Sequence, residues 1–103
     1  MKYLVYGNSR VLTGDAIADA VLAYSVALAQ HSTTDVINVP TADVHGVATT
    51  VGLILGPATS VLTEPAPDDE LEPEDAAFLL EIGRRTEAAL AVDASAFRTD
   101  FGR

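Results

Sequence analysis

Apolar residues recur at helical spacing between Asp15 and Gln30, the most regular segment of the chain. Four large side chains with i, i+4, i+7, i+11 spacing share one side of it: Ile17, Val21, Tyr24 and Leu28. A carboxylate at Asp15 suits the first turn, because it favours the positive end of the helix dipole. The pattern therefore predicts a helix that packs this side on a sheet.

Leu22 and Val26 lie on the opposite side of the same predicted helix, beside Asp19 and Gln30. A helix that is apolar on more than one side is normally covered on more than one side. We therefore expect these two residues to be covered by a C-terminal helix or by a second subunit.

The beginning of the chain has the composition of a β-hairpin. Residues 2–6 are rich in aromatic and branched side chains, which strands prefer. Gly7 and Asn8 follow, and both tolerate the positive φ that a two-residue hairpin turn requires. Residues 9–13 would then form the return strand. The alternative is a single loop over residues 7–14 that leads from a strand into the helix.

Three further strands are predicted downstream. A short strand over residues 35–39 ends, or becomes an edge, at Pro40, since proline has no N–H to donate. Residues 47–55 alternate between two faces and end in a continuous apolar run, which indicates a central strand buried on both faces at that end. Residues 59–63 form the last predicted strand.

An acidic linker follows these strands. Residues 64–72 hold two prolines and five carboxylates, which is typical of an exposed connection. The acidic run over residues 68–75 lacks the glycine and the alternating spacing of a calcium-binding EF-hand loop. It is either a solvated linker or a contact for a basic partner.

The last predicted element is a C-terminal helix over residues 73–92. Pro73 fits the first turn of a helix, and Glu81 and Arg85 have the i, i+4 spacing of an ion pair. Residues 93–103 would form a tail.

These elements predict one α+β domain. We expect a small, mostly antiparallel sheet of four or five strands packed by one long helix, with a C-terminal helix after the acidic linker. Residues 1–63 would form the core, and the helix over residues 73–92 would complete the same domain. The alternative is an open α/β sandwich in which residues 7–14 are a loop.

The distribution of charge excludes several classes of partner. The chain of 103 residues carries a formal charge of −9 at pH 7. No lysine or arginine occurs between Val11 and Gly83, while twelve carboxylates lie in that stretch. Such a surface repels phosphate, so we expect no binding of nucleic acid or of anionic membrane.

Composition also bears on compartment and cofactors. The chain has no cysteine, which excludes disulfides, thiolate metal sites and cysteine nucleophiles. Its longest apolar run, over residues 20–29, is shorter than the roughly 20 residues that span a bilayer, and its first apolar run is too short for a signal peptide. We expect a cytoplasmic protein without a cofactor. The preference for arginine over lysine and the abundance of alanine indicate a GC-rich genome, bacterial or haloarchaeal.

Few residues offer catalytic or metal-binding chemistry. His45 follows Asp43 by two residues, and the two could supply two metal ligands, but the nearby sequence offers no third or fourth ligand. Asp15 and Asp19 lie one helical turn apart and could hold a divalent ion or exchange protons, although a solvated first turn also explains them. His31 would end the first helix, where an imidazolium favours the negative end of the dipole.

We therefore expect a non-enzymatic domain that acts through protein–protein contact or self-association, as a homodimer. The predicted interface residues are Leu22, Val26, Phe97 and Phe101, with the alternative that the two phenylalanines fold back on the domain. The rival hypothesis is a small-ligand- or metal-binding enzyme that uses Asp43 and His45, or Asp15 and Asp19. A deep pocket lined by these groups would favour the rival.

Overall fold

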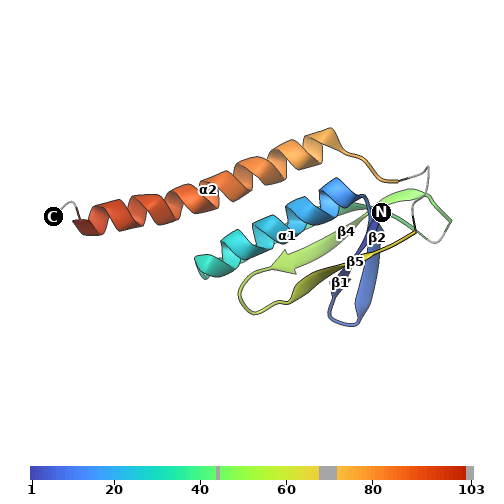
Figure 1. Ribbon diagram of the computed structural model, residues 1–103, viewed down its shortest axis with the longest axis horizontal. Coiled ribbons are helices and arrows are strands. Elements are labelled where there is room, and N and C mark those ends of the chain that lie inside the picture. The colour runs from blue at the N-terminus through green and yellow to red at the C-terminus, as the bar shows by residue number, and fades with distance from the viewer. Residues whose placement is uncertain (44, 68–71, 102–103) are drawn as a thin grey trace.

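The computed structural model describes residues 1–43, 45–67 and 72–101, with side chains described as far as Ala91. Within these residues the chain forms five strands and two helices (Figure 1). Their bounds are β1 Lys2–Tyr6, β2 Ser9–Thr13, α1 Asp15–Gln30, β3 Asp35–Ala42, β4 Ala48–Leu55, β5 Val61–Pro65 and α2 Ala76–Phe101. The α+β class predicted from the sequence is confirmed.

All strand pairs are antiparallel, but the strands form two small sheets. The first has the order β2-β1-β5, and the second consists of β3 and β4. β3 approaches β2 where the hydroxyl of Thr13 donates to the carbonyl of Pro40 at 2.6 Å. Proline has no N–H with which to continue a ladder on this edge, so the sheets remain separate there. The expectation of one sheet of four or five strands is wrong.

The first two strands form the predicted hairpin. Gly7 has a φ of +60°, which glycine adopts without a steric cost, and Gly7 and Asn8 alone connect Tyr6 to its partner Ser9. The register then continues to Lys2 opposite Thr13. The alternative, in which residues 7–14 form one loop of an open α/β sandwich, is wrong.

Both helices lie on the same side of the strands, and α2 packs along α1 (Figure 1). The four α1 side chains predicted to face the core, Ile17, Val21, Tyr24 and Leu28, are all buried. They share this core with Leu4 of β1, Leu55 of β4 and Ile82 of α2. The long helix is the C-terminal one, because α2 has 26 residues and α1 has 16. Neither helix, where the structure describes it, is long and apolar enough to cross a membrane.

α2 differs from its predicted bounds at both ends. It begins at Ala76 rather than Pro73, because Oδ1 of Asp75 accepts the backbone N–H of Phe78 at 2.9 Å and caps the helix there. It continues to Phe101 instead of ending near residue 92, and its last turns extend beyond the end of α1 (Figure 1).

Met1 contacts two residues of the connection between β5 and α2. The carbonyl of Met1 accepts the N–H of Ala66 at 3.1 Å, and its ammonium group lies 2.7 Å from Glu72. Beside this contact, the carbonyl oxygen of Pro73 would lie only 2.3 Å from a Cβ added at Gly14. A glycine at position 14 therefore lets the connection cross the start of α1.

Candidate functional site: the cleft between the sheets and the free edge of β4

The two aspartates predicted as a pair bind different cations of the protein itself. Asp15 Oδ1 lies 3.0 Å from the ammonium group of Met1, and Asp19 Oδ1 lies 2.7 Å from Nζ of Lys2. The hydrogen bond to Asp19 raises the pKa of Lys2. The two carboxylates therefore have different partners and do not face one shared ligand.

Asp43 shapes the loop between β3 and β4. Its Oδ1 accepts the backbone N–H of His45 at 2.8 Å and that of Val47 at 2.9 Å, which is how an aspartate stabilises a turn. The His45 side chain is exposed. Across the described ranges, no three histidine, cysteine, aspartate or glutamate side chains come together as a metal site would require. Asp43 thus has a structural role in this loop.

His31 ends α1, as the sequence predicted, and its backbone N–H donates to the carbonyl of Leu28 at 3.1 Å. Its side chain borders a hollow of about 520 Å³ that is also lined by Tyr24, Asp35 and Arg85.

A polar network beside this hollow joins three elements. Tyr24 of α1 donates its hydroxyl to Oδ2 of Asp35, at the start of β3, at 2.6 Å. Arg85 of α2 donates Nη1 to the same oxygen at 3.0 Å and Nε to Glu81 at 3.0 Å. The Glu81–Arg85 pair is confirmed. No local pattern in the sequence signals the contact of Asp35 with Arg85.

The network keeps its members in their ordinary charge states at neutral pH. Burial, and then the hydrogen bond to Asp35, raise the pKa of Tyr24 to about 12. Burial acts to raise the pKa of Asp35, but the hydrogen bonds from Tyr24, Val36 and Arg85 outweigh it and lower that pKa. A group that exchanges protons in catalysis needs a pKa near the working pH. The contacts of the network thus move the pKa values of Tyr24 and Asp35 away from neutral pH.

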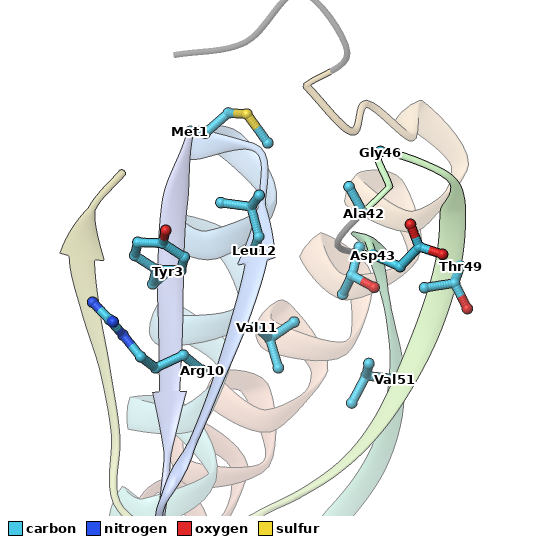
Figure 2. A pocket seen from close by; sticks show the side chains of 11 residues that line it. Met1, Tyr3, Arg10, Val11, Leu12, Ala42, Asp43, Gly46, Thr49 and Val51 are labelled. Atoms are coloured by element: carbon cyan, nitrogen blue, oxygen red, sulfur yellow. The ribbon is translucent and has the colours of Figure 1, made fainter. Parts of the chain in front are cut away.

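A cleft of about 650 Å³ opens between the two sheets (Figure 2). Tyr3, Arg10 and Leu12 of the β1–β2 hairpin lie on one side, and Thr49 and Val51 of β4 lie on the other. A cleft of this size could hold a small molecule.

The charged groups of the cleft are engaged by the protein itself. The guanidinium of Arg10 lies over the ring of Tyr3, 4.4 Å from its centroid, in a cation–π contact. Nη2 of Arg10 also lies 3.0 Å from Glu64 on β5. Asp43 lines the cleft, but one of its oxygens already accepts two backbone N–H groups.

β4 pairs with β3 alone, so its other edge is free in the part of the chain that the structure describes. The N–H of Asp43 donates to the carbonyl of Val47 at 3.0 Å and closes the hairpin. From that pair onward, hydrogen-bonded and non-hydrogen-bonded positions alternate along an antiparallel ladder. Four residues of β4 therefore direct their backbone N–H and C=O groups away from β3: Ala48, Thr50, Gly52 and Ile54.

Two contacts agree with this alternation. The carbonyl of Ile54 accepts the hydroxyl of Tyr6, which reaches it from the other sheet at 2.9 Å. Pro40 lies opposite Thr50, at a position where β3 needs no N–H. The three exposed residues Ala48, Thr50 and Gly52 thus present their backbone groups along the edge; we call these residues the β4 edge. The sequence predicted a central strand here, but Ile54 is 50% exposed and that prediction is wrong.

The β4 edge lies in an uncharged part of the chain. No aspartate, glutamate, lysine or arginine occurs between Asp43 and Glu64. β5, at the edge of the first sheet, carries Glu64 and Pro65, and the edge of β3 that faces β2 carries Pro40. Charged residues and prolines prevent unwanted strand pairing. β4 contains neither kind.

The structure describes the side chains of two of the four predicted interface residues, Leu22 and Val26. Leu22 is half-buried, whereas Val26 is 51% exposed. The side chains of Phe97 and Phe101 lie outside the described part of the chain, as do the residues 68–71 of the acidic run.

Comparison with known proteins found no matching family model, no similar curated protein and no similar solved structure.

Proposed function

We propose that this chain is a non-enzymatic domain that acts through protein–protein contact and associates as a homodimer. The observation that carries the proposal is the β4 edge, which is exposed, uncharged and without proline. A free edge of this kind is a template for pairing with another strand, and proteins that remain monomeric normally block it. An unblocked edge therefore favours a partner that covers it.

The charge of the chain restricts which partners and which contacts are possible. A net charge of −9 disfavours nucleic acid and anionic membranes as partners. It also disfavours contact between most parts of two copies, except where the surface is neutral. We place the protein in the cytoplasm, since a chain without cysteine makes no use of an oxidising compartment.

The state of the candidate catalytic groups supports a non-enzymatic role. Asp15 and Asp19 each bind a cation of the protein, and Asp43 holds a loop. These contacts leave the predicted pair Asp15 and Asp19 without a shared substrate position.

The proposal is tested by measuring molar mass over a range of concentrations. Sedimentation velocity and light scattering at low to high micromolar concentration should show a reversible rise from one to two chain masses. A single chain mass at every concentration, together with no binding of a strand peptide to the β4 edge, would refute the proposal. The alternative contact surface, predicted from the sequence, is α1 around Leu22 and Val26.

A second candidate function is binding of a small apolar molecule in the cleft between the sheets, which its volume favours. Val51 is half-buried in the cleft, whereas Ile54 lies outside it and is exposed. If a ligand screen by thermal shift gives a stabilising compound, Val51→Trp should abolish the stabilisation by filling the cleft. Ile54→Trp is the matched control and should retain it.

A further inference from the structure

We infer that the partner covering the β4 edge is a second copy of this chain, and that the two β4 strands pair antiparallel around a twofold axis at Thr50. This inference rests on the proposed function and specifies the contact that the function would use.

The hydrogen-bonding groups of the edge fix the register. The carbonyl of Ile54 already accepts the hydroxyl of Tyr6, so Ala48, Thr50 and Gly52 are the residues of this edge whose N–H and C=O groups are both open to a partner. This set is symmetric about Thr50. An axis there places Thr50 opposite Thr50 of the partner subunit and Ala48 opposite Gly52 of the partner subunit, so that every open position meets an open position.

The side chains of the β4 edge permit this approach. Alanine, threonine and glycine are small, and all three positions are exposed. Paired threonines opposite each other are a favourable cross-strand combination. The product would be a continuous sheet of four strands in the order β3-β4-β4-β3, in which neither copy has a free β4 edge.

The lack of charge on the β4 edge permits a second copy to approach there. Two chains of charge −9 repel one another, and the uncharged stretch between Asp43 and Glu64 is where they can meet with the least repulsion. A basic partner would be drawn to the carboxylates of the chain, and the residues of the β4 edge itself carry none.

Some repulsion remains close to the contact. Glu72, Glu74 and Asp75 border a hollow that is also lined by Ala48 and Thr50. Association should therefore be moderate in strength and sensitive to ionic strength.

The experiment that tests this inference uses the full chain with substitutions at one position, Thr50. Thr50→Lys would place two like charges opposite each other across the axis, and Thr50→Glu would do the same. Each variant alone should weaken dimerisation at least about tenfold in sedimentation velocity, a loss of about 1.4 kcal/mol. An equimolar mixture of the two should restore the dimer, because residue 50 of one copy then meets the opposite charge on the other.

Two controls make the result specific. Ser9→Lys introduces the same charge at an exposed position on β2 and should leave dimerisation unchanged. A mixture of Thr50→Lys with Ala48→Glu should restore less dimer than the mixture of the two Thr50 variants, since position 48 faces position 52. Circular dichroism and thermal melting check that every variant is folded; if Thr50→Lys is not folded, Thr50→Glu with and without added salt replaces it.

The outcomes separate this inference from the proposed function. Loss of the dimer in both single variants and its recovery in their mixture would support the inference. A dimer that persists in both variants would overturn the inference and leave the proposed function standing on another surface. A monomeric protein would also overturn it. Backbone NMR with a synthetic peptide of residues 46–56 then decides whether the edge still binds a strand. Shifts at Thr50 and Gly52 would preserve protein–protein contact at this edge and refute the homodimer, and their absence would refute the proposed function as a whole.

Discussion

Arg85 on α2 donates from Nη1 to Oδ2 of Asp35 on β3 at 3.0 Å, across 50 positions of the sequence. The same oxygen accepts the hydroxyl of Tyr24 on α1. One carboxylate therefore connects both helices to the second sheet. In the described part of α2, Ile82 is buried in the core and Phe78 and Leu79 pack against it, so this polar contact adds to an apolar one in positioning the helix.

Replacing Arg85 should destabilise the protein measurably. In Arg85→Gln the free energy of unfolding should fall by about 0.5–1 kcal/mol, because the side chains of Arg85 and Asp35 are 40% and 33% exposed and solvent screens the pair. Arg84→Gln is the matched control, since Arg84 contacts Glu81 on the same helix and is 72% exposed. Urea denaturation should show a smaller loss for the control; an equal loss would mean that the contact with Asp35 contributes nothing.

Tyr24 should make stability depend on alkaline pH. Its pKa is raised from 10.0 to about 12 in the folded protein. The neutral hydroxyl is therefore favoured by folding, and its contribution is complete below pH 10 and is lost as the pH rises from 10 to about 12. The difference in unfolding free energy between the unmodified protein and Tyr24→Phe should shrink over this range. A difference that is constant from pH 9 to 12 would contradict the shift.

The hairpin and α1 could be predicted from the sequence because both depend on local features. The hairpin depends on a two-residue turn at Gly7 and Asn8, and α1 depends on apolar residues at helical spacing. Each of these features lies within a short segment of the sequence. The separation of the sheets could not be predicted in this way. It depends on where Pro40 contacts Thr13, 27 positions away. The position of β4 at an edge depends on the order of the strands, since β4 pairs with β3 alone. The run from Leu53 to Leu55 resembles a central strand, yet Tyr6 rather than another strand contacts the carbonyl of Ile54.

Gly14 should tolerate no side chain. Its φ of −73° is accessible to any residue, so the expected cost of Gly14→Ala is steric and arises from the 2.3 Å approach to the carbonyl of Pro73. We expect a loss of about 1–3 kcal/mol, as in other overpacked sites. Gly83→Ala on α2 is the control, because nothing lies within 4 Å of its added Cβ and alanine favours a helix by roughly 0.5–1 kcal/mol. The melting temperature should thus fall for Gly14→Ala and rise for Gly83→Ala. A higher melting temperature for Gly14→Ala would show that the connection does not cross there.

Only part of the candidate site could be predicted from the sequence. Asp43 and His45 do share a loop, and Glu81 and Arg85 do pair, because sequence spacing constrains both. The β4 edge was missed, although its signal is present in the sequence. Residues 44–63 lack charged residues other than His45, and an alternating strand inside that stretch has no residue that would block pairing.

A substitution of Val26 distinguishes between the two surfaces proposed for association, the β4 edge and α1. The combined variant Leu22→Glu and Val26→Glu is hard to interpret, because Leu22 is half-buried and a carboxylate there would disturb the fold itself. Val26→Glu alone changes a side chain that is 51% exposed. If the β4 edge forms the dimer, this variant should keep the dissociation constant within about threefold in sedimentation velocity. Loss of the dimer in Val26→Glu, with an intact dimer in Thr50→Lys, would move the interface to α1.

Salt should strengthen dimerisation. Each copy carries a charge of −9, and Glu72, Glu74 and Asp75 lie near the β4 edge, so repulsion between copies opposes a contact that is itself uncharged. The Debye length falls from about 30 Å at 0.01 M to about 10 Å at 0.1 M salt, which screens that repulsion. The dissociation constant should therefore fall several-fold over this range in sedimentation velocity, and it should level off at higher salt. Glu74→Gln, which removes one exposed carboxylate beside the hollow, should reduce the salt dependence. A dissociation constant that rises with salt would mean that opposite charges hold the contact together. The neutral β4 edge has no such charges, so this result would contradict the proposed contact.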